Sequence, residues 1–75
     1  MRVSELRDLV AMDQIREGLL KTSQDGWQVA LEDFEGHQFP LTDATGRVKT
    51  YHSLDRATDI LKSLGVRKMC IQERF

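Results

Sequence analysis

Two basic residues and one aromatic residue alternate within a short segment of the chain, a pattern that could bind nucleic acid. Arg47, Lys49 and Tyr51 are separated by single residues, so on a β-strand their side chains would share one face. Cations hold phosphate groups and an aromatic ring stacks on a base in proteins that bind nucleic acid on a sheet. Lys68 and Arg74 share one face of a later predicted strand, and the surface would widen if the two strands were neighbours. We call these residues the basic face.

The competing interpretation of the basic face is an ordinary solvated strand surface. When a helix covers one side of a sheet, the other side faces water and is rich in lysine, arginine and threonine. The chain has 11 basic and 12 acidic residues, so its overall field does not attract nucleic acid or an anionic membrane. Nearby acidic residues, Glu32, Asp33, Glu35 and Asp43, would weaken phosphate binding further. Solvation is therefore the favoured interpretation, and nucleic-acid binding is the alternative.

The other groups that could do chemistry are the histidines His37 and His52 and the single cysteine, Cys70. They lack the paired spacing of a structural zinc site, and cysteine in an apolar strand usually behaves as a small buried hydrophobe. Asp55 and Asp59 lie one helical turn apart on an exposed face, where acidic residues more often mark solvent than a metal. The sequence therefore predicts no catalytic site, no metal site and no cofactor.

The clearest structural signal is an amphipathic helix over residues 54–64, followed by a strand over 67–72. At roughly 100° per residue, the apolar side chains of this helix occupy an arc of about 120°. Ser53 is a typical N-cap, and Gly65 is the residue type that ends helices. One face of the helix is thus expected to cover a sheet.

Between residues 27 and 51 the apolar pattern changes to a period of two, which is typical of strands. A first strand covers 27–32 and a second lies around residues 39–41, where Pro40 restricts it to a sheet edge or a bulge. A hairpin turn at 43–46 returns the chain as a third strand over 47–51. Together with the flanking helices this predicts one α+β domain over residues 1–75, in the order α-β-β-β-α-β. Its sheet is expected to be small, largely antiparallel and three- to four-stranded, with the sheet and its helix within 27–72.

Residues 4–21 are expected to be helical, but their apolar side chains cover about 220° of a helix circumference. Either the helix breaks near residues 11–13, or one continuous helix is buried on two sides, against its own sheet and against a second copy. Gly18 suits a close approach of another backbone or a helix that frays. Trp27 is expected to anchor the core and, in a dimer, the interface. The second arrangement predicts a homodimer with an interface formed by Met12, Ile15, Leu19 and Trp27.

Size and composition bound the function. A domain of 75 residues buries only about 60% of its unfolded surface, so oligomerisation is an expected supplement to its core. The single cysteine excludes an internal disulfide, and the chain has neither an apolar leader nor an apolar run that could span a bilayer, which predicts a cytoplasmic protein. We expect a small non-enzymatic intracellular protein-binding module, regulatory or inhibitory and homodimeric, of the kind that phages and plasmids encode. The alternative is a nucleic-acid-binding regulator that uses the basic face.

Overall fold

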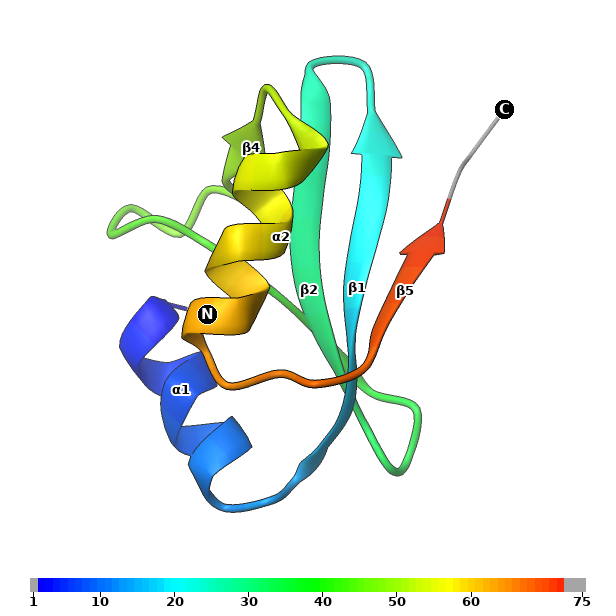
Figure 1. Cartoon of the computed structure of the whole chain (residues 1–75). Coiled ribbons are helices and arrows are strands. Elements are labelled where there is room, and N and C mark those ends of the chain that lie inside the picture. Colours follow the sequence, from blue (N-terminus) through cyan, green and yellow to red (C-terminus); the bar gives the residue numbers. More distant parts are fainter. Residues whose placement is uncertain (1, 73–75) are drawn as a thin grey trace.

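The computed structural model describes residues 2–72 and has the expected α+β architecture (Figure 1). In this part of the chain two helices accompany a five-stranded sheet, so one strand more is present than the sequence predicts. The elements are α1 (Val3–Ala11), β1 (Ile15–Ser23), β2 (Gly26–Asp33), β3 (Gln38–Pro40), β4 (Thr50–Tyr51), α2 (Leu54–Ser63) and β5 (Met69–Gln72).

The sheet is mostly antiparallel and has the strand order β3-β2-β1-β5. β1 and β2 form a hairpin, and β3 and β4 both pair with the other side of β2. β5 pairs with β1 in the parallel direction after the crossover through α2. Figure 1 shows β5 at one edge of the sheet, beside β1, and β4 on the other side of β2. β3 shares the edge opposite β5, because it also pairs with β2.

The additional strand replaces the second half of the predicted N-terminal helix. α1 ends at Ala11, and Asp13 adopts a left-handed conformation with a φ of 57°. Of the two alternatives for residues 4–21, the continuous helix is therefore wrong. The helix ends near residues 11–13, but the helical assignment of residues 15–21 is also wrong, because β1 occupies Ile15–Ser23. β1 carries buried apolar residues on both faces, since Leu20 points into the core and its neighbour Leu19 is buried on the opposite side of the sheet. Because these apolar side chains point to both faces of a strand, they spread over a wide arc when the segment is treated as a helix.

Local signals define α2 as the sequence predicts. The Ser53 side chain accepts the backbone N–H of Arg56 at 3.2 Å, and Gly65 follows the helix with a φ of 90°. Its apolar face packs on the sheet, and α1 adds Leu6 to the same core. The core consists of Leu6, Leu20, Val29, Leu31, Leu41, Ala57, Leu61, Leu64 and Val66.

The strands after the hairpin differ in position or length from those that the sequence predicts. β3 ends at Pro40 and lies at a sheet edge, which confirms the restriction that proline imposes. The predicted strand over 47–51 is reduced to Thr50–Tyr51, and a single bridge joins Thr42 to Val48 before it. The edge formed by β3 and β4 is therefore interrupted and irregular.

Candidate functional site

The structure does not assemble the basic face. Arg47 and Lys49 precede β4, whereas Lys68 precedes β5 at the opposite edge, with β1 and β2 between them. Tyr51 is half-buried against the core, and this burial raises the pKa of its phenol. Arg74 lies outside the described residues. The wider basic surface required the strand of Tyr51 and the strand that follows Lys68 to be neighbours. Within residues 2–72 these strands, β4 and β5, are not adjacent.

The predicted dimer interface is also dispersed, because it required a helix where β1 forms. Met12 is 64% exposed in the turn after α1, whereas Ile15 and Trp27 pack half-buried against the core. Leu19 is fully buried within the sheet. The helix on which the predicted interface of Met12, Ile15, Leu19 and Trp27 depended is therefore absent, and of this set only Met12 is exposed.

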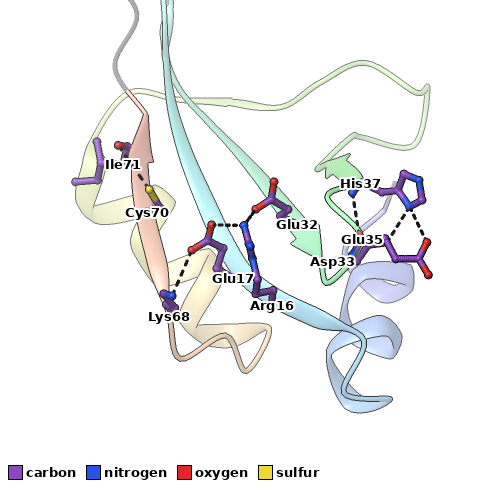
Figure 2. Close-up of polar contacts among 9 residues, drawn as sticks. All are labelled: Arg16, Glu17, Glu32, Asp33, Glu35, His37, Lys68, Cys70 and Ile71. Carbon is purple, nitrogen blue, oxygen red and sulfur yellow. Dashed lines mark hydrogen bonds and ion pairs between the residues drawn. The ribbon is translucent and has the colours of Figure 1, made fainter.

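The face of β1 opposite α2 carries a network of charged side chains (Figure 2). A Cβ on Gly18 would point at Leu61 of α2, so its neighbours Glu17 and Leu19 point to the other side, which we call the uncovered face. The Arg16 guanidinium forms ion pairs there with Glu32 and, at 3.3 Å, with Glu17. The hydrogen bond from Arg16 lowers the pKa of the Glu32 carboxyl.

This network reaches the segment that enters β5. Lys68 Nζ lies 4.0 Å from Glu17 Oε2, so the charged side chains link β2, β1 and the start of β5 (Figure 2). Leu19 and its cross-strand partner Ala30 are buried on the same face, although no described helix lies over them. The uncovered face is thus a short apolar centre surrounded by paired charges. Such a surface is typical of the side of a sheet that faces water and has only a structural role.

A cluster of polar side chains lies in the turn between β2 and β3, and no sequence pattern had indicated it. Ligand atoms of Asp33, Glu35 and His37 lie within 4.8 Å of one another. Asp33 Oδ1 accepts the backbone N–H groups of Glu35 and His37 at 3.0 and 2.8 Å. Partial burial raises the pKa of the Asp33 carboxyl, but the hydrogen bonds outweigh this effect and hold the pKa below its ordinary value. The carboxylate therefore acts as a turn-stabilising group.

The histidines and the cysteine considered from the sequence lie in separate parts of the fold. His37 belongs to the β2–β3 turn, His52 is exposed beside the Ser53 cap, and Cys70 lies half-buried in β5. β1 and β2 separate the edge that carries Cys70 from the edge beside His37.

The feature best suited to bind a partner is the outer side of β5, which we call the open edge. The Lys68 carbonyl accepts the Gly18 N–H at 2.8 Å, so the backbone groups of Lys68 face β1. Because successive residues of a strand direct these groups to alternate sides, Cys70 also faces β1, while Met69 and Ile71 face outward. Within residues 2–72, β5 pairs with β1 alone. The outward N–H and C=O groups are therefore available to another strand.

The side chains of β5 do not protect this edge. Natural edge strands usually carry a charged residue, a proline or a bulge that prevents pairing with another chain. On the opposite edge, β3 has three residues and ends at Pro40, whereas the four residues of β5 are uncharged and include no proline. Ile71 is 51% exposed beside the outward backbone groups. The Cys70 thiol lies 4.0 Å from the Ile71 carbonyl oxygen, which is the long limit for a thiol hydrogen bond.

A cleft of about 420 Å³ lies beside the start of β5, and its charges are mixed. Arg16, Arg67 and Lys68 line it together with the acidic residues Asp13 and Glu17. Since Arg16 and Lys68 are already paired with carboxylates, this cleft has no strong preference for an anion.

Comparisons of the chain with protein-family models, with curated proteins and with solved structures found no match. None of the described helices is both long and apolar enough to cross a membrane.

Proposed function

We propose that this chain is a small protein-binding module with a regulatory or inhibitory role, and that it binds an extended segment of its partner at the open edge. The observation that carries this proposal is the outer side of β5, which pairs with no other strand within residues 2–72 and carries no protecting charge or proline. In this mode of recognition, backbone hydrogen bonds supply affinity, and side chains at alternate positions supply specificity. The partner segment is expected to have apolar residues at alternate positions.

The side-chain directions of β5 support this type of partner. Met69 lies opposite Gly18 on the face covered by α2, and Ile71 lies opposite Leu20 on the same face. Met69 already packs against the core, whereas Ile71 remains exposed. An added strand would extend the apolar layer beneath α2 and cover Ile71. Its main-chain groups would at the same time pair with the outward groups of Met69 and Ile71.

The alternative of a nucleic-acid-binding regulator has weaker support. The cations that would bind phosphate are divided between opposite sheet edges, and Arg16 and Lys68 beside the cleft have acidic partners. A sheet-type nucleic-acid site also needs an exposed aromatic ring, and Tyr51 packs against the core instead. The geometry therefore favours a protein partner.

Partner recovery from the native host, with and without nuclease, followed by amide hydrogen exchange, tests this proposal. The Met69 and Ile71 amides should exchange rapidly in the isolated monomer and slowly in the complex. The Gly18 amide, which is bonded to Lys68 in the structure, is the internal reference and should be slow in both states.

Two results would overturn the proposal. One is a partner complex in which the Met69 and Ile71 amides remain as fast as in the monomer. The other is a complex that nuclease removes and that weakens steeply with salt, which would support nucleic-acid binding through counterion release.

A further inference from the structure

We infer that a second copy of this chain can occupy the open edge, with the two β5 strands antiparallel and related by a two-fold axis at Cys70. This inference rests on the proposed function, because both use the outward groups of β5. The two sheets would then join into one continuous sheet through β5 of each copy. No part of the N-terminal helix takes part in this contact.

The backbone directions determine the register of this pairing. Antiparallel strands exchange hydrogen bonds only between residues whose backbone groups face each other. The outward residues Met69 and Ile71 flank Cys70, so pairing centred on Cys70 places Met69 opposite the partner's Ile71 and Ile71 opposite the partner's Met69. Each of these residues then exchanges both of its backbone hydrogen bonds. A register shifted by one residue would place an outward residue opposite an inward one and lose these bonds.

The side chains are self-complementary in the same register. Met69 and the partner's Ile71 meet on the face covered by α2, so an exposed apolar side chain gains an apolar neighbour. On the uncovered face, Lys68 lies opposite the partner's Gln72, and no like charges face each other. The edge of a second copy therefore has the hydrogen-bonding groups and the polarity that this edge requires.

The size of the contact indicates how strong the dimer should be. Stable protein interfaces bury about 1,200–2,000 Å², and a contact made by one four-residue strand is small by that standard. We therefore expect a dimer that dissociates on dilution. A covalent trap is the appropriate measurement, because equilibrium methods at low concentration would record mainly monomer.

Cys70 supplies that trap. Directly opposed residues that do not exchange hydrogen bonds have Cα atoms about 4.5 Å apart, and disulfides span Cα separations of about 4.4–6.8 Å. Cys70 and the partner's Cys70 would form such a pair on the uncovered face. With oxidised glutathione as oxidant, the two thiols lose two protons and two electrons to form one disulfide, and two molecules of reduced glutathione are released.

The experiment compares the rate of disulfide-linked dimer formation under oxidised glutathione, read on non-reducing gels. The matched control is Cys70→Ser/Gln24→Cys, which moves the single thiol to an exposed turn residue. Cys70 should cross-link at least ten times faster than the control at equal protein concentration. Ile71→Pro removes an outward N–H without removing a hydrogen bond to β1, so it should lower the rate towards that of the control.

The register is tested by charge at Gln72. Gln72→Glu places a carboxylate opposite the partner's Lys68 and should raise the cross-linking rate at low salt, whereas Gln72→Lys should lower it. Neither substitution changes the outward backbone groups, so both remain informative if Ile71→Pro fails to fold. Adding Lys68→Glu to Gln72→Lys should restore the rate.

Cross-linking of Cys70 no faster than the Gln24 control, or rates insensitive to both Gln72 variants, would overturn the inference. In that event, slow exchange at Met69 and Ile71 in a complex with another protein would still support the proposed function. Fast exchange there in every complex would overturn both.

Discussion

Leu61 of α2 lies directly over Gly18 of β1. A Cβ atom on Gly18 would fall 2.9 Å from Leu61 Cδ2 and 3.0 Å from Val66 Cγ1. The sequence suggested a close approach of another backbone or a fraying helix at Gly18, but the structure instead places this glycine in a strand beneath a leucine side chain. Through this contact α2 packs against the central strand β1, and the contact fixes the position of the chain that continues into β5.

Leu61→Ala should lower the free energy of unfolding by about 2–5 kcal/mol, because it removes a fully buried side chain from the centre of the core. Urea denaturation followed by Trp27 fluorescence measures this change. Lys62→Ala, on the exposed side of the same helix, is the control and should change stability little. An unchanged midpoint for Leu61→Ala would contradict the packing of α2 on this sheet.

Gly18→Ala should also destabilise the protein, since the added methyl group overlaps Leu61 and Val66 and overpacking typically costs about 1–3 kcal/mol. The same substitution should cost less in the Leu61→Ala background, where the methyl group enters the vacated space. A double-mutant cycle measures this coupling. Strictly additive effects would show that the two residues are not in contact.

Gly26→Ala should destabilise the chain more than Gly36→Ala. Both glycines have positive φ angles, 140° and 89°, so both substitutions carry backbone strain. At Gly26 the added Cβ would also overlap the Tyr51 carbonyl oxygen, whereas nothing lies within 4 Å at Gly36. The difference between the two urea midpoints therefore measures the close approach of β4 to β2. Equal destabilisation would contradict that approach.

Asp43 should contribute to the stability of the protein above about pH 4 and lose that contribution in acid. Its Oδ1 accepts the Thr45 hydroxyl at 2.6 Å and the backbone N–H groups of Thr45 and Arg47 at 2.8 and 3.1 Å. These hydrogen bonds lower the pKa of the carboxyl from 3.8, so protonation is less favourable in the folded state than in the unfolded state. The stabilisation is then lost as pH falls through the folded pKa.

Asp43→Asn keeps an acceptor oxygen but removes the charge, so its unfolding free energy should decrease less steeply than that of the unmodified protein as pH falls below 4. Thermal melts between pH 2.5 and pH 7 provide the measurement. Asp59→Asn, on the exposed face of α2, is the matched control that also removes one carboxylate. Identical acid slopes for all three proteins would show that Asp43 does not have a depressed pKa.

The elements that the sequence determined are those specified by local interactions. The Ser53 cap, the apolar arc and Gly65 lie within a few turns of one another, and α2 begins and ends where they predict. The edge position of the strand that ends at Pro40 was likewise predictable, because proline lacks the N–H that a central strand needs. The end of α1 was not determined in this way, because the apolar arc of residues 4–21 was compatible with a break near residues 11–13 or with one continuous helix.

Tertiary structure decided the rest, because it depends on which segments become neighbours. Residues 15–23 have apolar side chains in directions that suit either a wide helical arc or a strand buried on both faces, and only pairing with β2 and β5 selects the strand. The dispersal of the basic face follows from the same strand order. The sequence likewise could not identify the open edge, because Met69 and Ile71 face outward only once the crossover through α2 has placed β5 parallel to β1.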